Sequence, residues 1–364
     1  MSEHRQPLET PLSAHHRSAG VNLGAWFGYA LPEDFGNPRE EQRYANESVA
    51  LLDKNYRAYI ALSGPDRVRY LNAIVTNDVK SLTNNHGRVA LLLNAQGHSV
   101  AELEVRAEAE RLFCISYAMI REPLLAWLDK YIIMDDVTMS DESEGYATLG
   151  VEGPRSAELV KALAGVDISL QEELGSVPGA LGGIACQIER RSFTEETPGA
   201  EFLVERGRAV EVWNVLREEA AKLGGGPMGY AALNAQRLAQ GAPWFGYDFG
   251  EKQIPHEAGL EQTHISYTKG CYTGQEIIER VRSRGQVNRN RVSIIFEGGG
   301  VPPSGERLLN AEGAEIGHVT RAAQSWHPRA IVGMGYVRRE AAVPGTKVAW
   351  AGGGAEVIAT PLRS

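Results

Sequence analysis

The feature that most constrains the fold of this sequence is an internal repeat. A strand-like apolar run that ends in Gly-Pro and is followed by apolar residues at helical spacing occurs twice, at Gly64-Pro65 and at Gly153-Pro154. The two copies are offset by 89 residues (153 − 64). Proline is favoured in the first turn of a helix, so each pair indicates the passage from a strand to a helix. The repeat predicts an α+β chain that contains two similar halves.

Each copy of the repeat continues with further strands and a second helix. In the first copy, the strands RVALLLN and SVAELEV are joined by a turn at residues 94–98, and RLFCISYA precedes a helix that begins near Glu122. In the second copy, IACQIERR and AEFLVE precede a helix from about Arg208 to Leu223. This order is typical of a split βαβ, ferredoxin-like unit. We therefore expect two ferredoxin-like halves with a ligand pocket between them.

The two ends of the chain differ from the repeat. Residues 1–50 contain four prolines and little periodicity, which predicts a loop-like segment that wraps around the rest. After Arg291, short alternating strands separated by glycine and proline predict a small β-barrel or sandwich. We expect three parts, whose first two can interleave: residues 1–145 with the wrap and the first half, 146–290 with the second half, and 291–364 with the barrel.

Composition and charge exclude several classes of protein. The chain has 43% hydrophobic and 23% charged residues, as soluble globular proteins do. No apolar run approaches the roughly 20 residues that cross a bilayer, and the first residues lack the apolar region of a secretory signal. A net charge of −9 disfavours broad, nonspecific binding of nucleic acid. We expect a cytoplasmic protein without a membrane segment.

The three cysteines, Cys114, Cys186 and Cys271, are far apart and odd in number, which indicates reduced thiols rather than a disulfide framework. Cys114 and Cys186 lie inside predicted strands, where a free cysteine behaves as a small buried hydrophobe. No Cys-x-x-Cys or His-x-x-x-His spacing offers a metal site. The glycine loops that bind phosphates or dinucleotides are also absent from the sequence.

The segment from Lys269 to Arg291, KGCYTGQEIIERVRSRGQVNRNR, combines a thiol, a lysine and a helical pattern. A capping-box pattern at Thr273 predicts that the helix begins there, and Gly285 is its natural end. Cys271 would then lie just before a helix N-terminus, where backbone donors, the helix dipole and Lys269 favour a thiolate. The pattern equally suits a small buried cysteine in a glycine-flanked turn.

The same segment contains five arginines. Guanidinium groups bind carboxylates and phosphates through paired hydrogen bonds, so the cluster predicts an anion site. One alternative is a solvated helix face, with Glu276 and Arg280 as an i,i+4 ion pair. Another is an RNA-binding surface, whose binding would depend steeply on salt. The cluster consists of Arg280, Arg282, Arg284, Arg289 and Arg291.

Two other places carry candidate binding residues. Glu201 lies at the start of an apolar strand, where a carboxylate is costly without a partner. Such a carboxylate can accept two parallel N–H bonds from a planar amidine-like edge, as in a pterin. A strand-end glutamate that faces solvent is the simpler alternative. The segment Phe245–Glu261 carries Asp248, His256 and Glu257 among glycines, as binding loops do, although such residues are more often part of the surface.

The run KGCYTGQE at Lys269 to Glu276 resembles the signature of the YgfZ-type folate-binding proteins, which are called tRNA-modifying proteins and are linked to the maturation of iron–sulfur enzymes. That group is related to the glycine cleavage T-protein, the aminomethyltransferase. The resemblance extends over nearly the whole chain, from TPL at Thr10 through GPR at Gly153 to the barrel. It implies a three-lobed ring around a folate pocket, with tetrahydrofolate or a derivative as the ligand.

The resemblance also implies roles for particular residues. Glu201 matches the glutamate that holds the pterin in the T-protein branch, Asn77 lies in a segment that lines the pocket, and Cys271 matches the cysteine of the YgfZ-type motif. Where aminomethyltransferases have an aspartate pair, this chain has Ala101 and Glu102. The first acid is therefore absent and the second is longer, which disfavours aminomethyl transfer.

We therefore predict a folate-binding protein that supports the assembly or repair of iron–sulfur cluster enzymes, through one-carbon or thiol chemistry at Cys271 with Lys269 beside it. Folate and iron–sulfur client proteins are the expected partners. Arg282 and Arg284 are expected to attract the carboxylates of a folate glutamate tail. The first alternative is a folate-dependent aminomethyltransferase or methyltransferase, and the second is an RNA-binding or tRNA-modification factor.

Overall fold

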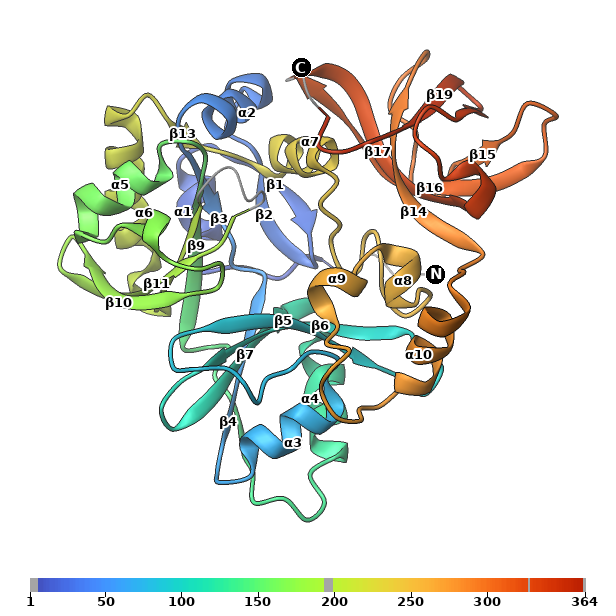
Figure 1. Ribbon diagram of the computed structural model, residues 1–364. Coiled ribbons are helices and arrows are strands. Elements are labelled where there is room, and N and C mark those ends of the chain that lie inside the picture. Colours follow the sequence, from blue (N-terminus) through green and yellow to red (C-terminus); the bar gives the residue numbers. More distant parts are fainter. Residues whose placement is uncertain (1–5, 193–198, 327, 363–364) are drawn as a thin grey trace. The chain divides into compact units, whose positions relative to one another are not determined.

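The computed structural model describes residues 6–192, 199–326 and 328–362, except for the side chain of Arg284 (Figure 1). Its contacts divide the chain into two compact units that are each assembled from discontinuous segments. The first unit comprises the chain up to Tyr70, Ser81–Arg88 and Glu104–Leu233, and the second comprises Leu71–Lys80, Val89–Leu103 and the chain from Asn234 onward.

The N-terminal segment contains regular structure, so the prediction that it is loop-like is wrong, whereas its wrapping around the rest stays a prediction. It forms helix α1 (Ser13–Ser18), the hairpin of β1 (Asn22–Trp26) and β2 (Tyr29–Asp34), and helix α2 (Pro38–Glu47). The hairpin turns through Phe27 and Gly28, both at positive φ, which suits the twist of antiparallel strands. Asn37 caps α2 by accepting a hydrogen bond from the backbone N–H of Glu40. Pro38, one of the prolines that predicted a loop, therefore begins a helix.

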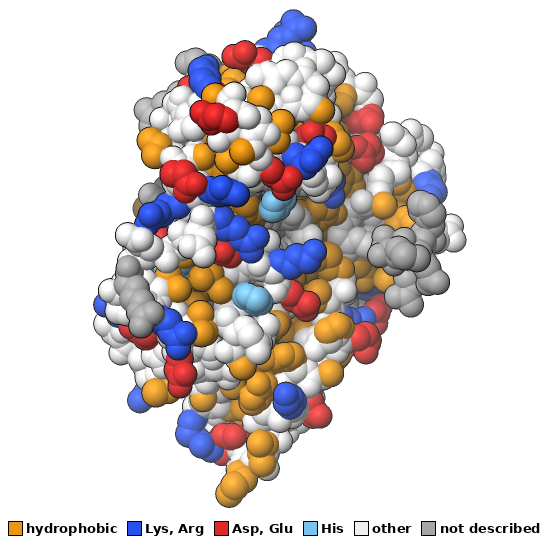
Figure 2. Space-filling model, turned by 90° about the vertical axis from the view of Figure 1, so that its right-hand side faces the viewer, with side chains coloured by type: hydrophobic (Ala, Val, Ile, Leu, Met, Phe, Trp, Pro, Cys, Tyr) orange, Lys and Arg blue, Asp and Glu red, His pale blue; other side chains and the backbone are white. Residues whose placement is uncertain are grey.

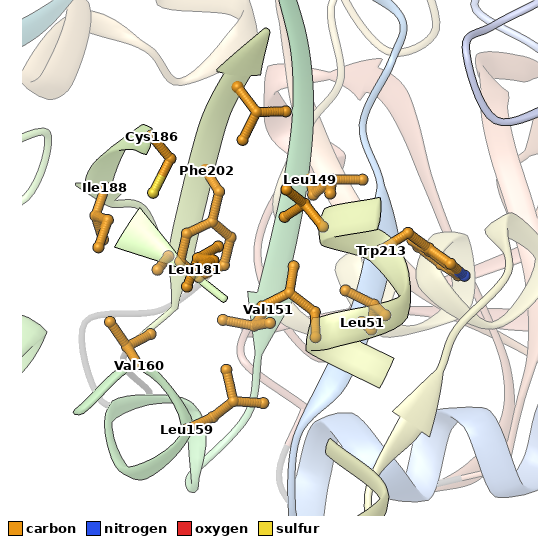
Figure 3. Close-up of a cluster of buried hydrophobic side chains, with 14 of the residues drawn as sticks. Leu51, Leu149, Val151, Leu159, Val160, Leu181, Cys186, Ile188, Phe202 and Trp213 are labelled. Atoms are coloured by element: carbon orange, nitrogen blue, oxygen red, sulfur yellow. The ribbon is translucent and has the colours of Figure 1, made fainter. Parts of the chain in front are cut away.

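A six-stranded sheet in the first unit has the order β10-β11-β12-β9-β3-β13. One face packs against helices α5 (Ser156–Ala164) and α6 (Ala209–Lys222), as the apolar cluster in Figure 3 shows. In strand β12, Phe202 and Val204 belong to this cluster, whereas Glu201 and Leu203 alternate with them and face the other way. The strands are β3 (Ala50–Asp53), β9 (Tyr146–Glu152), β10 (Ser176–Leu181), β11 (Ile184–Arg190), β12 (Ala200–Glu205) and β13 (Gly226–Pro227).

A five-stranded sheet has the order β5-β6-β7-β4-β8. Tyr59 of β4 and Phe113 of β7 pack with Tyr146 of β9 and Leu203 of β12, so in the first unit this sheet faces the second side of the six-stranded sheet. The hydroxyl groups of Tyr59 and Thr148 also lie 2.5 Å apart. The two sheets therefore enclose an interior layer. The strands are β4 (Arg57–Ser63), β5 (Gly87–Leu93), β6 (Ser99–Ala107), β7 (Arg111–Tyr117) and β8 (Thr138–Asp141).

The predicted repeat is visible at two strand-to-helix turns. Gly64 and Gly153 both adopt positive φ, and a Cβ at either position would collide with a backbone oxygen, which explains why glycine is required there. Helix α3 (Arg67–Ile74) follows the first turn and α5 follows the second. The ferredoxin-like halves are not confirmed, since the six-stranded sheet includes β3, which precedes the first copy of the repeat. They remain a prediction, as does the three-lobed ring.

The C-terminal region forms the predicted barrel, and the α+β class is confirmed. Its strands close in the order β14-β17-β16-β15-β18-β19 (Figure 1). Apolar side chains fill the interior from alternate positions, as Val292, Ile294 and Phe296 of β14 do. The strands are β14 (Arg289–Phe296), β15 (Arg307–Leu309), β16 (Glu315–Trp326), β17 (Arg329–Arg338), β18 (Lys347–Trp350) and β19 (Gly353–Ile358).

The described residues form five further α-helices: α4 (Arg121–Lys130), α7 (Tyr230–Gln240), α8 (Pro255–Ala258), α9 (Glu261–His264) and α10 (Gln275–Arg284). The sequence indicated α4 and α10, whereas α7 was not predicted. Among the described residues, no helix combines the length and the apolar character that crossing a bilayer requires.

Candidate functional site

Glu201 is buried in the interior layer of the first unit, with an exposed fraction of only 5%. Its Oε1 atom accepts hydrogen bonds from Lys54 Nζ and Arg57 Nη2, both at 2.9 Å. Its Oε2 atom accepts a longer bond of 3.2 Å from the same Arg57 nitrogen. The alternative of a solvent-facing glutamate is wrong, because the face of β12 that carries Glu201 is covered by the second sheet. The partner that a buried carboxylate needs is a pair of cations from the same unit.

Further ion pairs extend this arrangement into a network between the two sheets. Arg57 Nη1 donates to Glu104 Oε1 at 2.9 Å, so one guanidinium group holds Glu104 of β6 and Glu201 of β12 together. The other ion pairs of this charged layer are Arg191 with Glu104 at 2.9 Å and Lys54 with Glu152 at 3.5 Å, and Arg106 Nη1 also donates to Glu189 Oε2 at 3.4 Å. Buried charges persist only when such partners satisfy them.

The electrostatics of the layer fix the charge state of two glutamates in opposite ways. Burial by itself raises the pKa of Glu201, but Arg57 and Lys54 outweigh it and lower that pKa to about 2. Glu201 is therefore an ionised acceptor at neutral pH. Burial raises the pKa of Glu189 to about 8 against the attraction of Arg106, and the charges of Glu104 and Glu201 reinforce the rise. Glu189 is therefore mostly protonated at neutral pH.

The residues present fit a ligand that offers N–H donors to Glu201. A carboxylate has about four lone-pair directions, and this one accepts from two nitrogen atoms, Lys54 Nζ and Arg57 Nη2, with a single longer bond to Oε2. Acceptor capacity on Oε2 is therefore left for a ligand. Beside Arg57, the rings of Phe27 and Tyr56 stack with their centroids 4.3 Å apart, and Arg57 lies over the Tyr56 ring. Both rings are buried, so they form an apolar wall beside the charged groups.

In the second unit, the helix of the KGCYTGQE segment begins later than predicted. Helix α10 starts at Gln275 with Gly274 as its N-cap, and no side chain caps it, so the capping box at Thr273 is wrong. Gly274 has φ 82°, and a Cβ there would lie 2.7 Å from the carbonyl oxygen of Asn94. The close approach of two backbone segments therefore decides the start of the helix. Its predicted end at Gly285 is confirmed by a left-handed C-cap.

Cys271 is the exposed cysteine of the three, while Cys114 and Cys186 are buried. Burial raises the pKa of the Cys114 thiol to about 12 and that of Cys186 to about 11, which keeps both protonated. The exposure of Cys271 contradicts the alternative of a small buried residue in the turn. A reactive thiol needs access, and Cys271 has it. Its part in catalysis stays a prediction.

Lys269, predicted beside Cys271, donates to the carbonyl oxygens of Asn72, Val75 and Asn77 at 2.5, 2.5 and 3.1 Å. These carbonyls lie at the C-terminal end of α3 and just beyond it, where a cation is favourable. Burial lowers the pKa of Lys269 to about 8, although Asp78 opposes the change. Three carbonyls match the three donors of an ammonium group, so this lysine secures the backbone of residues 72–77.

Asn77 is also engaged by the backbone of its own unit. Its Nδ2 donates to the carbonyl oxygens of Val89 and Thr263 at 2.8 and 3.0 Å, and its Oδ1 accepts from the N–H of Asp78 at 2.9 Å. Both amide hydrogens are therefore used. The contacts identify Asn77 as a tie between three segments, and a direct contact with folate stays a prediction.

The arginines of the predicted cluster make different kinds of contact. Arg282 has a half-exposed side chain that lies over the Tyr267 ring and pairs with Glu279 at 3.5 Å. Arg289 pairs with Glu257 at 2.9 Å, whereas Arg291 donates to two backbone carbonyls. The side chain of Arg284 lies outside the described part of the structure. On the face drawn in Figure 2, basic and acidic side chains are interspersed.

The segment predicted as a binding loop is partly structural. Asp248 is fully buried and pairs with Arg237 of α7 at 2.5 Å, and it also accepts from the Thr320 hydroxyl of the barrel at 2.7 Å. Glu257 is the partner of Arg289. The Tyr267 hydroxyl and His256 Nε2 lie 2.9 Å apart. Most of the polar residues in this loop thus connect elements of the second unit.

Sequence reasoning missed a carboxylate–imidazole pair in the second unit. Glu102 Oε1 lies 2.9 Å from His264 Nε2, and His264 Nδ1 lies 2.7 Å from the Thr263 hydroxyl. Neighbouring side chains of a strand point to opposite faces, and the side chain of Ala101 is buried. The strand pattern would therefore have placed Glu102 on the other face of the strand. Reasoning also missed Lys54 and Arg57, although two basic residues at the edge of the apolar strand YIALS were a usable signal.

Two models of known protein families match the sequence of this chain. The model of the GCVT N-terminal domain matches residues 12–267, and that of the glycine cleavage T-protein C-terminal barrel domain matches residues 289–363. The protein belongs to the glycine cleavage T-protein family. This confirms the superfamily that the sequence resembled. The narrower assignment to the YgfZ-type branch is not confirmed.

Two curated relatives of this T-protein family member carry the name aminomethyltransferase. An aminomethyltransferase of Streptomyces avermitilis is 27% identical over 343 residues, which cover 93% of this chain and 92% of the relative. One of Halothermothrix orenii is 28% identical over 347 residues, covering 93% and 94%. The crystal structure of aminomethyltransferase T from Bartonella henselae superposes with a TM-score of 0.87 over 97% of both chains at 22% identity, so the fold is shared. None of these names supports the predicted role in iron–sulfur assembly.

Proposed function

We propose that the protein is a tetrahydrofolate-dependent transferase of a one-carbon unit, of the aminomethyltransferase type. The observation that carries the proposal is the match of both family domains to this chain, together with relatives named aminomethyltransferase that cover more than nine tenths of it. The function first considered as an alternative thus becomes the main one. Bound tetrahydrofolate would supply the nitrogen atoms that accept the one-carbon unit.

Glu201 is the residue that we propose to hold the pterin. Its pKa of about 2 keeps it ionised, and burial makes each hydrogen bond that it accepts stronger than in water. Arg57 and Lys54 hold the carboxylate in one orientation before a ligand arrives. Pre-organised acceptors bind planar N–H donors without the cost of ordering a side chain.

Glu102 and His264 are the residues that we propose for proton transfer. Moving a one-carbon unit from an amine to another nitrogen requires the removal of a proton from the attacking N–H and its delivery to the leaving group. The hydrogen bond of 2.9 Å between Glu102 Oε1 and His264 Nε2 allows this pair to hold and pass one proton. The pair supports an acid–base role despite Ala101, since Glu102 retains one of the two acids of aminomethyltransferases.

A second candidate function rests on a different observation. The motif KGCYTGQE resembles that of YgfZ-type proteins, and its Cys271 is exposed. We propose as the alternative that the chain binds folate and supports iron–sulfur enzymes through the Cys271 thiol. The two candidates differ in whether the thiol or the Glu102–His264 pair is required.

The deciding experiment measures turnover and rescue with the same set of variants. Purified protein with tetrahydrofolate and an aminomethyl donor should form methylene-tetrahydrofolate, and Glu102→Gln should lower kcat by roughly 10²-fold, the scale of a lost general acid or base. Cys271→Ser should keep the wild-type rate. If the wild type binds folate without turnover, and a deletion strain regains iron–sulfur enzyme activity from the wild type but not from Cys271→Ser, the second candidate replaces the first.

A further inference from the structure

We propose that Glu104 is a second carboxylate that recognises the amino group of the pterin, and that it sets specificity together with Glu201. The proposal rests on the proposed binding of tetrahydrofolate and adds a residue that the family resemblance did not indicate. The proposal requires a ligand of one chemical class, a planar ring with adjacent N–H donors and a carbonyl oxygen.

The first observation is an unpaired oxygen on Glu104. Its side chain is more than nine tenths buried, and its Oε1 atom accepts from Arg57 Nη1 and Arg191 Nη2, both at 2.9 Å. Its Oε2 atom is buried and has no hydrogen-bond partner among the described residues. A desolvated carboxylate oxygen without a donor is costly, so native proteins rarely leave one. A ligand N–H at this oxygen would remove the cost.

The second observation is that Arg57 joins Glu104 to the proposed pterin residue. Its Nη1 holds Glu104 and its Nη2 holds Glu201, so a ligand edge that reaches one carboxylate is adjacent to the other. The Nε of Arg57 is itself buried without a partner among the described residues. The cluster thus offers an unpaired acceptor and an unpaired donor. A 2-amino-4-oxo ring presents the complementary groups, since its amino group has two N–H donors and its carbonyl is an acceptor.

The third observation is open space beside the network. A cavity of about 430 Å³ is lined by Arg106, Gln187 and Leu203, among other residues of the first unit. Each of these lies two positions from a glutamate of the layer on the same strand, since β6 carries Glu104, β11 carries Glu189 and β12 carries Glu201. Residues two apart share one face of a strand and lie about 7 Å apart. The cavity therefore lies next to the charged layer, and its volume suits a small ligand.

Calorimetric titration with tetrahydrofolate at pH 7 tests the proposal. Glu104→Gln should weaken binding by about ten- to a hundredfold, the range of a charge-assisted hydrogen bond. Glu189→Gln is the matched control: it replaces a buried glutamate of the same layer that is mostly protonated at this pH, so binding should change by less than about threefold. Wild-type affinity in Glu104→Gln would overturn the proposal.

A ligand that lacks the 2-amino group shows whether Glu104 recognises that group or only supports the structure of the site. With the tetrahydrofolate analogue that carries a methyl group in place of the 2-amino group, the wild type should lose affinity, and Glu104→Gln should lose much less on the same change. An equal loss in both proteins would mean that Glu104 only supports Arg57 or holds a water molecule. If Glu104→Gln does not fold, as judged by thermal unfolding, Glu104→Asp keeps the charge and should show the same reduced discrimination. If the wild type does not bind tetrahydrofolate at all, the proposed function fails before this inference does.

Discussion

The charged layer of the first unit and the KGCYTGQE segment of the second unit place their polar groups in contrasting ways. In the layer, side chains bind side chains: Arg57 and Lys54 hold Glu201, and both partners of each pair are buried. In the segment, a side chain binds backbone: Lys269 donates to three carbonyls, while the Cys271 thiol is exposed to solvent. The most recognisable motif of the sequence, KGCYTGQE, therefore mainly stabilises the backbone of a neighbouring segment. The ionic chemistry lies in residues that carry no motif.

The largest expected effect tests the claim that the layer depends on its cations. Arg57→Met should lower the free energy of unfolding by about 3–5 kcal/mol, because it leaves two buried carboxylates without their shared partner. Urea unfolding followed by circular dichroism measures the loss. The control is Arg282→Met, whose side chain is half exposed and whose effect should stay within about 0.5 kcal/mol. Equal effects of the two variants would remove the contrast between the regions.

The next effect tests whether Lys269 is structural or catalytic. Lys269→Met removes three hydrogen bonds from a charged donor, so the free energy of unfolding should fall by about 2–3 kcal/mol. Lys222→Met, at an exposed lysine paired within its own helix, should change it by less than about 0.5 kcal/mol. A Lys269→Met protein with wild-type stability and no turnover would show that the segment carries chemistry after all.

A third prediction concerns the pH dependence of the layer. The pKa of Glu189 rises from 4.5 to about 8 on folding, so the folded state binds the extra proton between these values. Its contribution to stability is then fully present below about pH 4.5 and is lost as the pH rises through about 8. Glu189→Gln mimics the protonated acid. It should therefore be more stable than the wild type at pH 9, by about 1–3 kcal/mol, with little difference at pH 5.

The prediction for Glu189 depends on the balance between the charges around it. Arg106 stabilises the ionised form, while Glu104 and Glu201 oppose it. If the difference between Glu189→Gln and the wild type is the same at pH 5 and pH 9, Arg106 dominates and Glu189 is ionised throughout. Unfolding curves at both pH values, with Glu152→Gln for comparison, would separate these cases.

Local patterns in the sequence predicted local structure well. The two Gly-Pro turns, the strands around them, the C-terminal barrel and the end of α10 at Gly285 all depend on residues close in sequence. The start of α10 was missed because Gly274 is required by contact with Asn94, about 180 residues away in the chain (274 − 94). The partners of Glu201 were missed for the same reason: Arg57 is 144 residues away. Pairing of this kind depends on sheet register and packing, which periodicity does not reveal.

The smallest expected effect concerns Arg282, which the sequence indicated as a partner of the folate glutamate tail. Its guanidinium lies over the Tyr267 ring and pairs with Glu279 at 3.5 Å, so it is partly engaged and partly exposed. An exposed ion pair with a ligand carboxylate is worth up to about 1 kcal/mol, or about fivefold in affinity. Arg282→Gln should therefore weaken folate with several glutamates by about two- to fivefold and the monoglutamate by less. The matched variant Arg289→Gln should not discriminate between the two ligands, since Arg289 is held by Glu257. If Arg282→Gln also treats both ligands alike, the exposed arginine has no part in binding the tail, and recognition would rest on the buried layer alone.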